Sequence, residues 1–203
     1  MSRQFAALCA VFALAAAPAQ ATELFGGLYG HDVTFIGETI GSGAAGREEG
    51  WDIHLGARSK PIAALARVGR PQAHAFVSLN SEKTSNFAAA GLSWRIGVSE
   101  RFYVRPGLGM GITDGKAKLP PVNQPGIPFP EILRRLKLYN TRIDFGSKVL
   151  FEPELAVGWQ VTPRLAAELS WVHFSHGQIL HQGKNQGIDL AGLRLVYSLA
   201  PGR

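Results

Sequence analysis

Three polar side chains towards the C-terminal end of the chain have the types and spacing that ester hydrolysis requires. His173 and Ser175 are two residues apart in an alternating segment, so both side chains emerge on one face of a strand. Asp189 opens the next alternating segment, on the face that carries its apolar residues. A serine hydroxyl attacks an ester when an imidazole takes its proton, and a carboxylate holds that imidazole in the required tautomer. The sequence therefore predicts Ser175 as the nucleophile, His173 as the general base and acid, and Asp189 as the group that orients His173.

A serine esterase also needs hydrogen-bond donors for the oxyanion that forms on the attacked carbonyl. Such donors are expected directly after the nucleophile, where the backbone N–H of Gly177 or of a neighbouring residue is available. A lone His-x-Ser pattern in a strand usually has no chemical role. The carboxylate on the same face of the partner strand is what favours the catalytic interpretation.

Strands must position these residues, because helical periodicity is nearly absent and an alternation of apolar and polar residues recurs along the chain. In the segment 51–58, Trp, Ile, Leu and Ala occupy one face, while Asp, His, Gly and Arg occupy the other. Eight such segments are predicted as strands, over residues 24–35, 51–58, 73–80, 90–96, 102–110, 145–159, 165–175 and 189–198.

The charges decide which face of these strands points outward. Beyond the first 21 residues nothing is apolar for the ~18 to 20 residues that a membrane helix needs, so a membrane form must be a closed barrel. Eight strands enclose space only for packed side chains or one small ligand, and opposite charges can neutralise one another there. We predict an all-β fold, an eight-stranded antiparallel transmembrane β-barrel whose apolar face meets lipid. The charged residues expected in its lumen are Arg58, Arg95, Arg105, Lys148, Glu152, Glu154, Glu168 and Arg194.

The connections between the segments differ in length, as they do in outer-membrane barrels. Residues 98–101 and 161–164 are predicted as short periplasmic turns, whereas residues 60–71 are long for such a turn. The long outer loops are predicted at 37–50, 113–144 and 176–186.

The longest outer loop contains a segment with helical spacing, Pro130 to Leu138, that carries Arg134, Arg135 and Lys137. A short helix near phosphate-bearing headgroups and a solvated loop helix are both compatible with it. Gly107, Gly109 and Gly111 lie in one strand without a nucleotide-binding pattern, so they are expected to relieve crowding inside a narrow barrel.

The first residues have the layout of a cleaved secretory signal. Arg3 precedes an apolar run too short to span a bilayer, and Ala19 and Ala21 suit a signal peptidase. We expect residues 1–21 to be a signal peptide and residues 22–203 to be one outer-membrane barrel domain. The single cysteine, Cys9, would leave with the signal, so no disulfide or thiol chemistry is expected.

The composition limits the partners. The net charge of +6 is compatible with an anionic partner such as phosphorylated lipid, and equally with a basic solvated surface. The histidines at 31, 54, 74 and 181 lack metal-ligand spacing, so neither a metal nor a cofactor is expected. A nucleic-acid partner is not expected, and association into homodimers is left open.

From Val172 to Leu190, and more loosely over the barrel, the chain resembles the outer-membrane lipid A 3-O-deacylases of the PagL type. That family shows a His-x-Ser-Asn run, then a loop and a Gly-Ile-Glu-like segment. The resemblance implies that His173 and Ser175 match its catalytic pair and Asp189 its acidic member. It also implies hydrolysis of the ester at the 3-position of lipid A in lipopolysaccharide, without metal or cofactor.

The chain departs from the family pattern at two positions. His176 stands where the family has Asn, and Asp189 stands where it has Glu. If that Asn binds the oxyanion, His176 must replace it as a donor.

Two other interpretations stay open. A structural or lipopolysaccharide-binding barrel without catalysis would place His173, Ser175 and Asp189 at the membrane rim, where polar residues cost little. A secreted soluble barrel would need an apolar lumen. The predicted function is a serine esterase of the Gram-negative outer membrane that removes the 3-O-linked acyl chain from lipid A.

Overall fold

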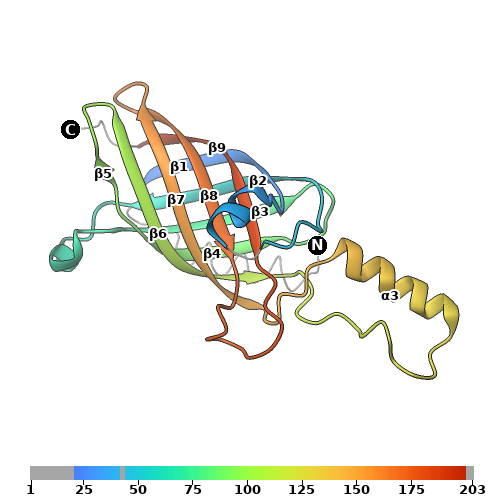
Figure 1. Ribbon diagram of the computed structural model, residues 1–203. Helices are drawn as coiled ribbons and strands as arrows, with labels where there is room; N and C mark the ends of the chain where they lie inside the picture. Colours follow the sequence, from blue (N-terminus) through green and yellow to red (C-terminus); the bar gives the residue numbers. More distant parts are fainter. Residues whose placement is uncertain (1–20, 42–43, 200–203) are drawn as a thin grey trace.

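The strands form one antiparallel sheet that closes into a barrel (Figure 1). The computed structural model describes residues 21–41 and 44–199. Neighbouring strands follow the order β4-β3-β2-β1-β9-β8-β7-β6, and the pairing of β4 with β6 closes the ring. The two-residue β5 continues the β4 side along β6, so the wall has eight strands, as predicted. The strands are β1 (Ala21–Gly30), β2 (Trp51–Ser59), β3 (Gln72–Asn80), β4 (Phe87–Ser93), β5 (Ile96–Gly97), β6 (Phe102–Thr113), β7 (Val149–Gln160), β8 (Leu165–Phe174) and β9 (Ile188–Ser198).

The two faces of the wall have opposite polarity. Apolar side chains cover the outside: Leu28 on β1 is 61% exposed and Leu193 on β9 is 65% exposed. Charged side chains point inward and are buried, including Arg58, Arg105 and Arg194. This distribution is typical of a transmembrane barrel and opposite to that of a soluble barrel with an apolar lumen.

Buried ion pairs hold the lumen together. The Glu168 carboxylate accepts hydrogen bonds from Tyr103 Oη at 2.7 Å, Arg105 Nε at 3.1 Å and Arg58 Nη2 at 3.3 Å. Arg194 donates to the same carboxylate through Nε and reaches Glu154 Oε2 at 3.0 Å through Nη1. Each of these buried arginines and glutamates therefore faces an opposite charge, which is the condition under which ions are tolerated away from water.

Glycines on β6 leave room for this network. A Cβ added at Gly107 would lie 2.5 Å from Glu154 Cγ, and one at Gly109 would lie 2.5 Å from Glu152 Oε2. The predicted role of these glycines, relief of crowding in a narrow lumen, is confirmed.

Two of the residues predicted inside lie elsewhere. Arg95 is exposed, with its guanidinium carbon 3.9 Å from the Tyr103 ring centroid. Lys148 is exposed, and its Nζ donates to the carbonyl oxygens of Asp114 and Gly115. The prediction was wrong for both because Arg95 follows the end of β4 and Lys148 precedes β7, where alternation no longer determines the direction of a side chain.

The first strand is also shorter than predicted. It ends at Gly30 rather than near residue 35, and the helix α2 (Phe35–Ile40) follows. Asp32 adopts a positive φ of 49°, and its carboxylate accepts the backbone N–H groups of Arg47 and Glu48. These bonds to a later segment turn the chain away from the wall, so the apolar residues after Asp32 do not extend the strand.

The two ends of the barrel differ in their connections. One end carries residues 31–41, 44–50, 81–86, 114–148 and 175–187, and the other carries 60–71, 94–101 and 161–164. Because outer-membrane barrels have long outer loops and short periplasmic turns, the first set marks the outer end. The predicted helix at Pro130 to Leu138 is present as α3 (Phe129–Thr141), which projects beyond that end (Figure 1). Within the described ranges, no helix is long and apolar enough to cross a membrane.

A buried histidine connects the first outer loop to the barrel wall. His31 Nδ1 lies 2.8 Å from Asp52 Oδ1, and its Nε2 lies 3.2 Å from Glu48 Oε2. Burial alone would lower the pKa of His31, but the hydrogen bonds to Asp52 and Glu48 outweigh it and raise the pKa to about 9. The imidazolium therefore ties the first outer loop to β2 at neutral pH.

Replacing Glu168 with Ala should destabilise the barrel by about 3 to 5 kcal/mol, because three arginines lose a shared buried partner. Denaturant unfolding of the barrel in detergent micelles measures this change. Glu100→Ala, at an exposed turn position, is the matched control and should change the free energy of unfolding by less than about 0.5 kcal/mol. Equal effects of the two substitutions would contradict the role of the ion network.

The stability of the barrel should fall as the pH rises through about 9. Because the folded-state pKa of His31 is raised, its contribution is complete below about 6.5 and is lost as the pH passes the folded-state value. The loss should reach about 3 kcal/mol, measured by unfolding between neutral pH and pH 10. His31→Gln should be less stable at neutral pH and nearly independent of pH over this window. A pH dependence that survives in His31→Gln would rule out this histidine as its source.

Candidate active site

The pairing of β8 with β9 brings two of the predicted site residues face to face. His173 stands directly opposite Asp189 in the register, and His173 Nδ1 lies 2.7 Å from Asp189 Oδ1. Both residues occupy the face of the wall that carries Leu169 and Leu193, which are exposed on the outside. The pair therefore lies on the outer surface of the barrel, at the outer ends of β8 and β9.

This outward-facing pair is nevertheless buried: Asp189 is 0% and His173 is 6% exposed. The chain that leaves β1 crosses beside it, where Val33 N donates to Asp189 O at 2.9 Å. Further along, Ala45 N donates to Gly187 O at 3.2 Å, so α2 is held beside the outer end of β9 (Figure 1). Periodicity did not predict this segment, which removes a carboxylate from direct contact with lipid.

Ser175 lies one residue beyond β8. Its backbone is fixed against β7, because Phe151 N donates to Ser175 O at 2.7 Å. The side chain is half-buried and follows His173 by two residues. Within the described part of the chain, no hydrogen bond joins Ser175 to His173. The Trp171 indole stacks near the His173 imidazole, with the ring centroids 6.1 Å apart.

His176, the next residue, has a fully buried side chain with both ring nitrogens engaged. Nδ1 accepts the backbone N–H of Gln178 at 3.2 Å, so this nitrogen carries no proton. Nε2 therefore carries the proton and donates to Lys184 O at 3.1 Å. In this arrangement the two hydrogen bonds of the imidazole hold the 175–187 loop in shape, and its only N–H is not available to an oxyanion.

Gly177 adopts a left-handed φ of 60°, which glycine tolerates and other residues rarely do. Its backbone N–H makes no hydrogen bond among the residues that the structure describes. The neighbouring ring of Phe151 would lie 3.3 Å from a Cβ at this position. Of the two expected oxyanion donors, the Gly177 amide is therefore the one that is available.

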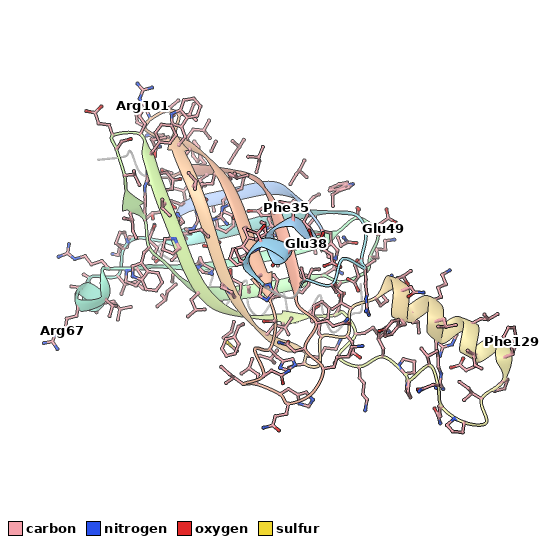
Figure 2. All side chains as sticks on the ribbon, viewed as in Figure 1. Phe35, Glu38, Glu49, Arg67, Arg101 and Phe129 are labelled. Carbon is pink, nitrogen blue, oxygen red and sulfur yellow. The ribbon has the colours of Figure 1, made fainter. Side chains whose placement is uncertain are left out.

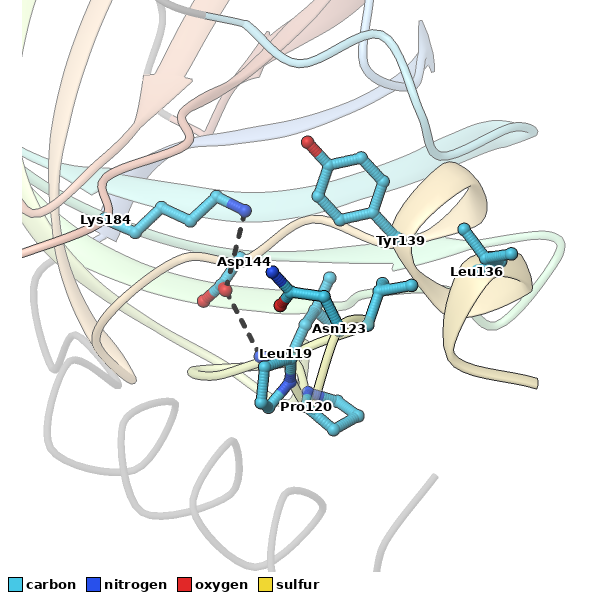
Figure 3. A pocket seen from close by; sticks show the side chains of 9 residues that line it. Leu119, Pro120, Asn123, Leu136, Tyr139, Asp144 and Lys184 are labelled. Carbon is cyan, nitrogen blue, oxygen red and sulfur yellow. Dashed lines mark hydrogen bonds and ion pairs between the residues drawn. The ribbon is translucent and has the colours of Figure 1, made fainter. Parts of the chain in front are cut away.

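The outer loops are joined around a cavity of about 340 Å³ (Figure 3). Lys184 Nζ lies 3.8 Å from Asp144 Oδ2 and 4.9 Å from the Tyr139 ring centroid. Arg47 approaches the same ring to 4.4 Å. Since His176 donates to Lys184 O, the loop after Ser175 is linked to α3 and to the first outer loop. The cavity is lined by Leu119, Pro120, Pro121, Val122, Asn123, Leu136, Tyr139, Asp144 and Lys184.

The remaining histidines do not gather. His31 and His74 contact carboxylates inside the barrel, His54 is stacked among aromatic rings, and His181 lies in the outer loop. In the part of the chain that the structure describes, no group of three or more His, Cys, Asp or Glu side chains is arranged to hold a metal ion.

A closed antiparallel wall with an apolar exterior and a charged lumen defines a transmembrane β-barrel of the outer membrane. Comparison with protein families matches residues 72–198 to lipid A 3-O-deacylase (PagL). The matched range contains β3 to β9 and includes His173, Ser175 and Asp189. The chain therefore belongs to the PagL family of outer-membrane lipid A deacylases.

Solved structures match this chain at low sequence identity. The crystal structure of the outer membrane enzyme PagL matches with a TM-score of 0.52 and 11% identity, over 87% of this chain and 99% of that one. The N-terminal β-barrel domain of Pseudomonas aeruginosa OprF has a TM-score of 0.44 and 8% identity, over 88% of this chain and 98% of that one. A de novo designed transmembrane β-barrel has a TM-score of 0.44 and 12% identity, over 90% and 98%. A search of curated proteins gave no match.

Replacing His176 with Ala should loosen the loop after Ser175 without unfolding the barrel, because both bonds of the imidazole lie within that loop. Hydrogen exchange of the backbone amides between residues 177 and 186 should accelerate by about tenfold, the effect of losing one to two kcal/mol of local stability. Gln182→Ala, an exposed change in the same loop, should leave the exchange unchanged. Unchanged exchange in His176→Ala would show that other contacts hold the loop.

Proposed function

We propose that this protein is a serine esterase of the outer membrane that removes the 3-O-linked acyl chain from lipid A, with Ser175, His173 and Asp189 as its catalytic triad. The observation that carries the proposal is the 2.7 Å contact between His173 Nδ1 and Asp189 Oδ1 on the outer face of the barrel. Membership of the lipid A deacylase family supports the substrate.

The contact with Asp189 selects the tautomer that the reaction needs. An ionised carboxylate accepts hydrogen bonds and cannot donate them, so His173 carries its proton on Nδ1. The lone pair of Nε2 is then free to accept the proton of Ser175. The hydrogen bond from Ser175 to Nε2 forms in the substrate complex, as catalytic hydrogen bonds that are long in a free enzyme commonly do.

The reaction proceeds in two halves. Ser175 Oγ attacks the ester carbonyl carbon while its proton passes to His173 Nε2. The tetrahedral intermediate collapses, the bond to the 3-oxygen of the sugar breaks, and His173 returns the proton to that oxygen. A water molecule then attacks the acyl-serine while its proton passes to His173 Nε2. The second intermediate collapses, the bond to Ser175 Oγ breaks, His173 returns the proton to that oxygen, and the fatty acid leaves. Neither half requires a metal or a cofactor.

The Gly177 amide donates to the oxyanion in both halves, since no described residue accepts a hydrogen bond from its N–H and it lies two residues after the nucleophile. His176 acts indirectly, because its bonds to Lys184 and Gln178 fix the turn that presents this amide. It is therefore a positioning residue, and the asparagine of the family pattern does not need a chemical equivalent at this position.

The pairing register of β8 and β9 allows Asp189 to replace the longer glutamate of the family pattern. Asp189 lies directly across from His173, and the two side chains touch without the extra methylene of a glutamate. The departure from the family pattern is thus accommodated by the local pairing of the strands, which favours an active enzyme over a binding barrel.

The position of the site supports lipid A as the substrate. An outward-facing site can reach an acyl ester only when that ester lies in the same leaflet. His173 stands at the outer end of β8 and Ser175 directly follows it, near the level of the headgroups, where the ester bonds of lipid A lie.

Export by a cleaved signal is part of the same proposal. Residues 1–20 lie outside the described residues, and β1 begins at Ala21, so cleavage after Ala21 would leave the strand almost whole.

Mass spectrometry of lipid A from cells that express the protein tests the proposal. The wild type should remove the mass of one acyl chain, and Ser175→Ala should reduce the rate at least about 1000-fold without loss of folding. Ser170→Ala, on the same strand but facing the lumen, is the matched control and should stay active. Deacylation by Ser175→Ala would refute the nucleophile. An inactive but folded wild type would favour the lipopolysaccharide-binding barrel.

The substitution Asp189→Asn tests whether Asp189 orients His173 for catalysis rather than contributing to substrate binding. The amide can donate to His173 Nδ1 and so favours the wrong tautomer, which should lower kcat by about 100- to 10,000-fold with little change in KM. Kinetics on purified lipid A in detergent measure both constants. An unchanged kcat would remove Asp189 from the triad.

A further inference from the structure

The connection between β2 and β3, residues 60–71, is the one long turn at the periplasmic end, and the proposed reaction at the other end does not use it. Its centre is the 3-10 helix η1 (Ala63–Val68), which has no buried residues. Val68 is 56% exposed, and three alanines of the helix are also exposed. Figure 1 shows η1 standing out to the side of the barrel wall rather than across its mouth.

The connection has a defined shape despite this exposure. Ile62 N donates to Pro71 O at 2.9 Å and closes the base of the loop. Gly69, with a φ of 88°, ends the helix, and Arg70 N donates back to Leu65 O at 3.1 Å. This shape keeps the apolar side chains of η1 away from the rest of the protein. Exposure of these side chains to water would be energetically unfavourable.

An aromatic residue fixes the loop to the wall. Trp94 Nε1 donates to Val68 O at 2.6 Å, and Trp94 follows directly on β4. Tryptophans gather at the level of the headgroups in membrane barrels. The contact therefore places η1 beside the lipid-facing surface, at the depth of the interface.

The charges of the loop are of one sign. Lys60, Arg67 and Arg70 are all exposed, and residues 59–71 contain no carboxylate. None of the three forms an ion pair with any described residue. The two neighbouring turns add Arg95, Arg101 and Arg164 against the single carboxylate of Glu100. Figure 2 shows Arg67 at the outer tip of η1, pointing away from the protein.

We propose that the 60–71 loop is an interfacial anchor that binds anionic phospholipids of the periplasmic leaflet. The apolar side chains of η1 enter the boundary of the acyl chains, while Lys60, Arg67 and Arg70 contact the phosphates. The loop continues the lipid-facing wall, and the excess of positive charge complements anionic headgroups. These two observations favour lipid over a protein partner. The anchor does not depend on the esterase mechanism.

A label on η1 tests the depth of the loop. The full chain with Cys9→Ser and Ala64→Cys, spin-labelled and reconstituted into phosphatidylcholine vesicles containing phosphatidylglycerol, should be accessible to oxygen and protected from a water-soluble nickel chelate. The same label at Ser99, in the neighbouring turn, should report an aqueous environment. An Ala64 label as accessible to nickel as the Ser99 label would overturn the proposal and indicate a loop that faces the periplasm.

A fluorescent label at the same position tests the choice of lipid. From the quenching, the local association constant for brominated phosphatidylglycerol should exceed that for brominated phosphatidylcholine by at least about fivefold. This preference should vanish when Lys60, Arg67 and Arg70 are all replaced with Gln. Lys116, Lys118 and Lys137→Gln, at the outer end, is the matched control and should keep the preference. Heat-modified migration on gels verifies folding of both variants. A preference that survives the first triple substitution would refute the proposed cation contacts.

Discussion

In the hydrocarbon core of a bilayer a backbone N–H or C=O finds no water, so every such group of a spanning segment must pair within the protein. The pairing of β4 with β6 meets this requirement, since it leaves the sheet without an edge. Closure with eight strands then limits the lumen to the width of packed side chains. The charged interior, the glycines of β6 and the outward position of the candidate site all follow from that limit.

A narrow lumen also explains where chemistry can occur. The interior is filled by Glu168, its three arginines and the aromatic rings above them, so it has no room for a substrate with several acyl chains. A reacting group must lie on the outer wall or among the loops. His173 and Asp189 lie on that wall, and the chain after β1 shelters them from lipid. The site thus combines access from the membrane with the protection that a buried carboxylate requires.

The two ends of the barrel serve different purposes. At the outer end, His31, Lys184 and Arg47 tie separate loops together and hold the segment around Ser175 in place. At the periplasmic end the turns are short, except for the loop that carries η1. The outer loops are thus joined by contacts between distant residues, whereas the periplasmic turns carry an excess of positive charge.

The sequence by itself determined the strand number, the polarity of the two faces and the strand positions of His173 and Asp189, because strand alternation is local and leaves a readable pattern in the chain. It also located α3 from helical spacing. Only the tertiary structure decided where that pattern stops: β1 ends at Gly30 because Asp32 binds the distant backbone at Arg47 and Glu48, and Arg95 and Lys148 lie past the strand ends. It likewise decided that His176 is bound to Lys184, that Val33 covers Asp189, and that η1 stands out beside Trp94. Each of these contacts joins residues that are far apart in the sequence or lie in loops without a period, so no local pattern records them.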